Sequence, residues 1–138
     1  MNKSSRFVML IAIGAFLGGC DSTSPTTPVT FVPSAFTGNF GGSYTAIGLE
    51  SGTMTVVIGT SGAIEGNVNS TGFLETGLVT GNISQQGKCN MNVSLPMNDS
   101  TAMHTVVVKN TDGSITGAGT EVYHGKTYPL SFTLTVTP

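Results

Sequence analysis

The sequence predicts an all-β domain, an antiparallel up-and-down meander of about eight strands that closes into a small barrel, with a two-sheet sandwich as the alternative. Short segments in which apolar and polar residues alternate predict strands with one buried face. Turn pairs such as Asp112-Gly113 and His124-Gly125 separate these segments. Glycine is abundant, with 19 residues, and good helix formers are scarce, which argues against a helical bundle.

The strands are placed by alternation and bounded by turn residues. The clearest is the last, in which four apolar residues share one face and hydroxyl residues occupy the other. The segment that begins at Lys88 alternates as regularly. We expect strands at residues 38–48, 52–59, 63–69, 74–84, 88–95, 102–110, 114–123 and 127–137.

The predicted inward faces supply apolar side chains of medium size. An eight-stranded barrel is just wide enough for such side chains to fill, so we expect a closed, dry core. Glycines within strands, Gly66 and Gly117 among them, favour a curved barrel over a flat sandwich. Residues 55–66 also resemble residues 105–117, which leaves a duplication open. The predicted inward positions are Met54, Val56, Ile58, Ile64, Val68, Cys89, Met91, Val93, Leu95, Val106, Val108, Leu130, Phe132, Leu134 and Val136.

The first twenty residues have the pattern of an export signal. Lys3 and Arg6 precede an uninterrupted run of apolar residues and glycine from Phe7 to Gly19. A helix of that length covers about 20 Å, which is less than the roughly 30 Å of hydrocarbon that a membrane span must cross. A short apolar run behind a positively charged start is typical of a signal peptide.

The run ends in Leu17-Gly18-Gly19-Cys20, which resembles the lipobox of the bacterial lipoprotein family. The resemblance implies cleavage between Gly19 and Cys20. It also implies a covalent diacylglyceryl and N-acyl lipid on Cys20, the only cofactor that we expect. The mature chain keeps three lysines and seven carboxylates, a net charge of −4, so the acyl chains must hold it at an anionic membrane.

Three parts are therefore expected along the chain. They are a signal peptide at residues 1–19, a lipidated cysteine with a Ser/Thr/Pro-rich tether at 20–34, and a β-barrel-like domain at 35–138. The resemblance places the protein in the bacterial cell envelope, attached to the inner or outer membrane and facing the periplasm or the cell surface. In texture, through Gly-rich strands and Ser/Thr-Gly turns, the domain is similar to transferrin-binding-protein-like barrels of lipoproteins. No binding residue follows from that similarity.

Residues that carry chemistry are few and scattered. Cys89 is the only cysteine left once Cys20 is lipidated, and its strand face predicts a small buried side chain. His104 and His124 lack metal-site spacing, so we expect no metal. No nucleophile elbow or phosphate loop is present, which predicts a protein that is not an enzyme. The carboxylates expected to be solvated are Glu50, Glu65, Glu75, Asp99, Asp112 and Glu121.

Composition excludes one class of partner and leaves three functions open. Only 9% of residues are charged, so no surface could neutralise a run of nucleic-acid phosphates. The favoured function is a non-catalytic binding or interaction module that meets a protein or glycan through its outer face and turns. The alternatives are a lipocalin-like carrier of a small apolar ligand and an inhibitor of periplasmic hydrolases.

Overall fold

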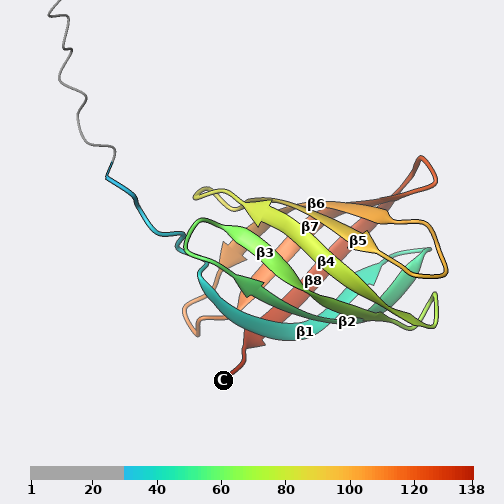
Figure 1. The fold of residues 1–138 in the computed structure, drawn as a ribbon, viewed down its shortest axis with the longest axis horizontal. Coiled ribbons are helices and arrows are strands. Elements are labelled where there is room, and N and C mark those ends of the chain that lie inside the picture. Colours follow the sequence, from blue (N-terminus) through green and yellow to red (C-terminus); the bar gives the residue numbers. More distant parts are fainter. Residues whose placement is uncertain (1–29) are drawn as a thin grey trace, which may run out of the picture. The chain divides into compact units, whose positions relative to one another are not determined.

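The computed structural model describes residues 30–138, which form a closed antiparallel barrel of eight strands (Figure 1). The predicted all-β meander is confirmed, as a barrel and not a sandwich. Each predicted strand boundary lies within two residues of the observed one. The strands are β1 (Gly38–Ala46), β2 (Glu50–Ile58), β3 (Ala63–Ser70), β4 (Glu75–Ile83), β5 (Lys88–Ser94), β6 (Thr101–Lys109), β7 (Ile115–Tyr123) and β8 (Lys126–Val136).

The seven turns divide between the two ends of the barrel. The β1–β2, β3–β4, β5–β6 and β7–β8 turns lie together at what we call the far end, on the right in Figure 1. The other three turns lie at the entry end, where the chain joins β1. There the backbone N–H of Ser34 donates to the carbonyl of Thr60 at 2.8 Å, and Phe36 is buried. The side chain of Gln85 holds the same segment by donating to the Val32 carbonyl at 3.0 Å.

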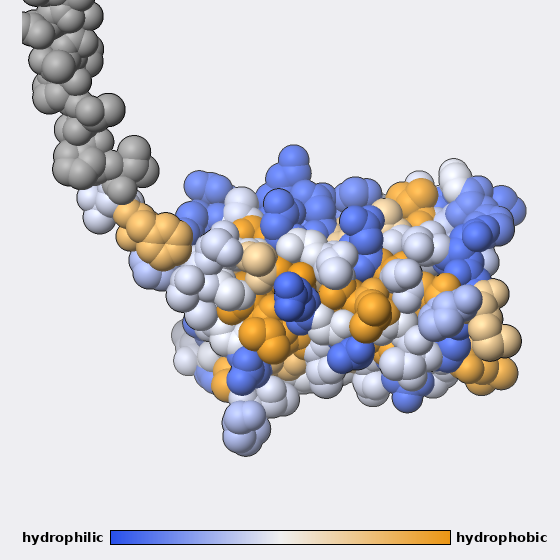
Figure 2. Space-filling model, viewed as in Figure 1, coloured by the Kyte–Doolittle hydropathy of each residue, from blue (hydrophilic) through white to orange (hydrophobic). Residues whose placement is uncertain are grey.

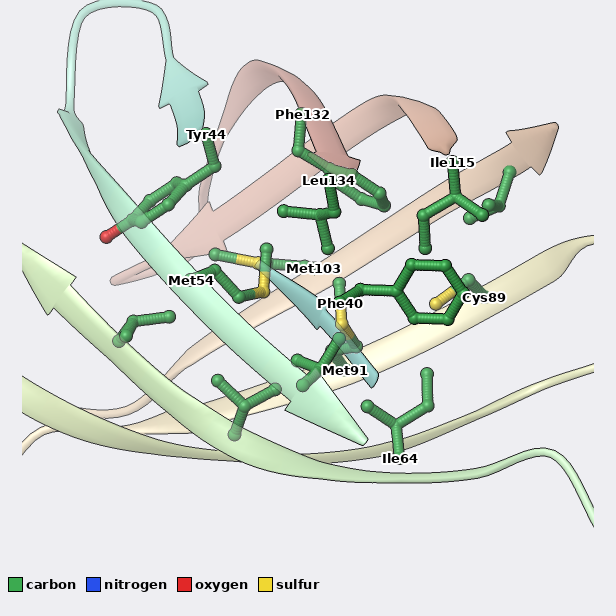
Figure 3. Close-up of a cluster of buried hydrophobic side chains, with 14 of the residues drawn as sticks. Phe40, Tyr44, Met54, Ile64, Cys89, Met91, Met103, Ile115, Phe132 and Leu134 are labelled. Atoms are coloured by element: carbon green, nitrogen blue, oxygen red, sulfur yellow. The ribbon is translucent and has the colours of Figure 1, made fainter. Parts of the chain in front are cut away.

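Inward side chains from all eight strands fill the interior of the barrel. Figure 3 shows Phe40, Met54 and Met103 packed against one another from different strands, and all three are almost completely buried. Cys89 is buried as predicted. All but three of the predicted inward residues are buried; the exceptions are Val136, at the entry-end mouth, and two valines of β6.

The prediction for β6 was wrong because it reversed the faces of the strand. Val106 and Val108 are 61% and 57% exposed, whereas Val107 is only 3% exposed. Three consecutive valines carry no period of two, so the local sequence cannot say which of them point inward. Pairing with β5 decides the matter, because Met103 lies opposite the buried Met91.

The alignment of residues 55–66 with residues 105–117 does not match structurally equivalent positions. Residues 55–66 form the β2–β3 hairpin and residues 105–117 the β6–β7 hairpin. That alignment matches the inward Val56 with the outward Val106. A shift of one residue moves every side chain of a strand to the other face, so the matched strands β2 and β6 differ in orientation.

Inward glycines bring neighbouring strands and side chains close together. A Cβ atom on Gly66 would lie 2.0 Å from the Thr55 carbonyl oxygen of β2. A Cβ atom on Gly117 would lie 2.2 Å from the ring of Phe132. These positions therefore accept only glycine without a shift of backbone or ring, which explains the glycines within the strands of so narrow a barrel.

Candidate functional site

Three turns of the far end each hold an apolar side chain out to solvent. Ile47 in the β1–β2 turn is 66% exposed, Leu74 in the β3–β4 turn 87%, and Met97 in the β5–β6 turn 88%. We call these three residues the far-end rim. Figure 2 shows apolar residues at this end of the barrel, on the right, apart from the patches along the wall. The exposure of apolar side chains in three turns at one end makes this end a candidate contact surface.

Leu74 is held in a strained backbone conformation. Its φ of 56° lies in the left-handed region, which a bulky residue adopts at a cost of about 1–3 kcal/mol. The Leu74 side chain is exposed, so no burial of apolar surface in the folded protein offsets that cost. Strained residues of this kind concentrate at binding sites, which makes Leu74 the first rim residue to test.

Polar contacts join the turns of the far end to one another. Glu75 accepts a hydrogen bond from the backbone N–H of Met97 at 2.9 Å and another from the side-chain amide of Asn98. Nε2 of His124 lies 2.6 Å from a carboxylate oxygen of Asp99. The β5–β6 turn is therefore tied both to the start of β4 and to the β7–β8 turn.

A row of rings, which we call the far-end cap, lies at this end of the barrel and consists of Phe73, Tyr123 and His124; of these, Phe73 packs against the core. The Phe73 and Tyr123 ring centroids are 5.1 Å apart, and those of Tyr123 and His124 are 4.1 Å apart. The backbone N–H of Phe73 donates to the hydroxyl of Ser70 at 3.0 Å, and that hydroxyl donates to the carboxylate of Glu50. The cap is thus hydrogen-bonded to a carboxyl group inside the barrel.

Two carboxyl groups, which we call the acid pair, lie inside the far end. Glu50 is the first residue of β2 and Glu121 lies in β7, and both are buried. The hydroxyls of Tyr44, Ser70 and Thr101 are buried with them. Among the described residues, both oxygens of Glu121, one oxygen of Glu50 and the hydroxyls of Tyr44 and Thr101 have no hydrogen-bond partner.

The environment of Glu121 favours its protonated form. Burial is the main cause that raises the pKa of Glu121, to about 7; the Thr101 hydroxyl opposes this, and the charge on Glu50 adds to it. Burial also raises the pKa of Tyr44, and the Glu50 charge adds to that effect. At neutral pH Glu121 is therefore close to the point at which it loses its proton.

The prediction that all carboxylates are solvated was wrong for these two residues. Glu50 and Glu121 occupy inward positions of their strands, but glycines interrupt the apolar alternation there. The signal was present: counting back in twos from the inward Met54 passes Gly52 and reaches Glu50. Glycine has no side chain that marks a face, so the visible alternation of β2 ends before Glu50.

The other predicted residues lie apart from this cluster. Cys89 is near the entry end, and burial raises the pKa of its thiol to about 11. Nδ1 of His104 lies 2.8 Å from the side-chain oxygen of Asn90 on the outer wall. Glu65 and Asp112 are exposed as expected. The signal peptide at 1–19 and Cys20 lie outside the described residues.

Comparisons of the chain with protein-family models, curated proteins and solved structures gave no match. Within residues 30–138, no three His, Cys, Asp or Glu side chains come together as a metal site. The part of the chain that the structure describes contains no helix long and apolar enough to cross a membrane.

Proposed function

We propose that the chain is a lipid-anchored protein of the bacterial cell envelope whose barrel is a non-catalytic interaction module. It binds a protein partner through the far-end rim of Ile47, Leu74 and Met97. The observation that carries this proposal is the exposure of three apolar turn residues at one end, one of them in a strained conformation. The residues that lead into β1 join the barrel at the entry end, and the far-end turns lie at the opposite end of the barrel.

The packing of the interior supports a binding surface over a carrier. A lipocalin-like carrier needs an open calyx, and eight strands leave room for one small ligand only when side chains do not fill the space. Here large side chains from opposite walls meet, including Phe40, Met54 and Met103 (Figure 3). The turns and the outer wall are then the surfaces left for a partner.

Photocrosslinking from the rim tests the proposed function. A photoreactive amino acid at Met97 is expected to capture one partner of defined mass in cell envelopes. The same amino acid at Val57, which is 54% exposed on the outer wall, is expected to capture none. Equal capture from both positions contradicts the assignment to the rim. Saturable binding of a fluorescent fatty acid by the purified protein contradicts the proposal in favour of a carrier.

Leu74→Asn is expected to separate binding from stability. Asparagine adopts the left-handed conformation readily, so the free energy of unfolding should stay level or rise by about 1 kcal/mol. Loss of the apolar side chain should nevertheless reduce capture from position 97 severalfold. Urea unfolding and crosslink yield measure the two effects. Leu78→Asn, on the exposed wall of β4, is the matched control and should leave capture unchanged.

Cys20→Ala tests the lipid anchor. Metabolic labelling with a palmitate analogue should mark the wild-type protein and miss the variant, because the lipobox resemblance assigns the acyl groups to this thiol. The wild-type protein should partition into detergent and the variant into the aqueous phase. Equal labelling of the two proteins would overturn the anchor and the envelope location with it.

A further inference from the structure

The acid pair is buried without any base to neutralise it. Among the described residues, no lysine, arginine or histidine is buried, whereas Glu50 and Glu121 both are. A buried carboxylate that lacks a cationic partner is costly, and two that share a site cannot both ionise cheaply. The charge must therefore be removed by a proton or balanced by a cation from outside.

The groups around the pair favour a proton over a metal ion. The polar groups packed against it are hydroxyls, from Tyr44 on β1, Ser70 at the end of β3 and Thr101 on β6. In the strand register the buried apolar residues Met103 of β6 and Ala46 of β1 lie opposite Glu121 and Glu50. Two carboxylates are fewer acidic ligands than a tight divalent site uses.

The remaining titratable groups of the far end are exposed or partly buried, and one of them, Tyr128 of β8, lies opposite Glu121 in the strand register and packs against the core. His124 and Asp99 form their exposed pair, and Glu75 bonds to the β5–β6 turn. Lys126 is exposed, and Tyr123 and Tyr128 are partly buried. A test of the acid pair must also separate it from His124, the exposed histidine of the β7–β8 turn.

A continuous series of contacts links the acid pair to the rim. Glu50 accepts from Ser70, and Ser70 accepts from the backbone of Phe73, the neighbour of the rim residue Leu74. The turn also lies directly against the acid, because a Cβ atom on Gly72 would be 2.7 Å from Cβ of Glu50. A second charge on the pair therefore acts on the turn that presents Leu74.

We propose that Glu50 and Glu121 form an internal proton-binding site that keeps the far-end cap closed while one proton is held between them. When the pair releases that proton, two like charges remain in the barrel, and water must reach them by loosening of the cap. The proposal goes beyond partner binding, and it stands or falls independently of whether the rim has a partner.

The sign of the pH dependence follows from where the proton is held. The raised pKa of Glu121 in the folded protein means that the folded state keeps a proton that the unfolded chain has already lost. Stability from this site is therefore complete below about pH 4.5 and falls as pH rises towards about 7. Over that interval the unfolding equilibrium constant should rise on the order of 10²-fold.

Carboxyl NMR of the full chain tests the proton site directly. The sequence has four glutamates, so ¹³C labelling gives four Cδ signals that single Glu→Gln variants assign. One signal is expected to titrate near pH 7 and to vanish in Glu121→Gln, which mimics the protonated acid and should fold. Glu50→Gln should move the remaining signal of the pair to lower pH. Absence of any glutamate titrating above pH 6 overturns the proposal.

Tyrosine fluorescence tests the link to the cap. The protein has no tryptophan, and its three tyrosines, Tyr44, Tyr123 and Tyr128, all lie at the far end. Acrylamide quenching should increase severalfold between pH 5 and 8 in the wild-type protein and stay flat in Glu121→Gln. Glu65→Gln, an exposed acid on β3, is the matched control and should behave as wild type.

Two further arms exclude the alternatives. His124→Asn removes the imidazole and suits the positive φ of 49° at this position, so the rise in quenching should persist. A flat response in that variant assigns the switch to His124 and overturns the proposal. Calcium chloride at pH 8 should not restore closure. A saturable restoration that Glu121→Gln abolishes would show that a cation occupies the site, which also overturns it.

Discussion

Val107→Asp is expected to leave the protein unfolded. Val107 is 3% exposed and points into the barrel from β6, where an aspartate would place a charge among apolar side chains. A buried unpaired charge is among the few single changes that cost more than about 4 kcal/mol, a large part of the stability of a small domain. Loss of the cooperative transition in urea, followed by circular dichroism, measures the effect.

The neighbouring substitution Val106→Asp is the matched control. Val106 is 61% exposed, and it lies opposite Lys88 of β5 on the outer wall. A charge there stays in water beside a cation, so the free energy of unfolding should change by no more than about 0.5 kcal/mol. A larger loss in Val106→Asp than in Val107→Asp would mean that the faces of β6 are the reverse of those described.

Gly117→Ala is expected to destabilise the barrel by about 3 kcal/mol. The added Cβ would lie 2.2, 2.4 and 2.7 Å from three atoms of the Phe132 ring, and the filled interior leaves the ring little room to move. Urea unfolding at pH 5, where Glu121 is protonated, measures the loss.

Two variants show whether the ring is the cause. Gly59→Ala meets nothing closer than 3.8 Å, so its effect should stay within about 0.5 kcal/mol. Phe132→Leu in the Gly117→Ala background should cost less than Phe132→Leu alone, because the clash is relieved in the double mutant. Additive losses would place the strain elsewhere.

The strand pattern was predictable because it depends on local signals that the sequence states clearly. Alternation of apolar and polar residues, which is most regular in β5 and β8, marks the strands, and turn residues mark their ends. Together these signals predict the bounds of all eight strands to within two residues. The faces of β6 were not predictable in the same way, because Val106, Val107 and Val108 are equivalent until β5 supplies a partner. Register is a property of two strands and cannot be read from one.

The candidate site was hidden from the sequence for a different reason. Glu50 and Glu121 are ordinary surface residues by type, and only the closure of the barrel brings them together from β2 and β7. The rim depends on which turns share an end and on the φ of Leu74, and neither is encoded in a motif. Chemistry assembled from single residues on distant strands leaves no local pattern to find.

The pairing of β1 with β8 joins the two ends of the domain and closes the barrel. It joins Ala46 to Leu130 and Phe40 to Val136, residues more than 80 positions apart. Until β8 has been synthesised, one edge of β1 has backbone groups without hydrogen-bond partners. Bringing these distant strands together also costs conformational entropy, because a long loop must be closed. Such long-range pairing slows folding. A chain of this topology is therefore expected to complete its fold only after its last strand has been synthesised.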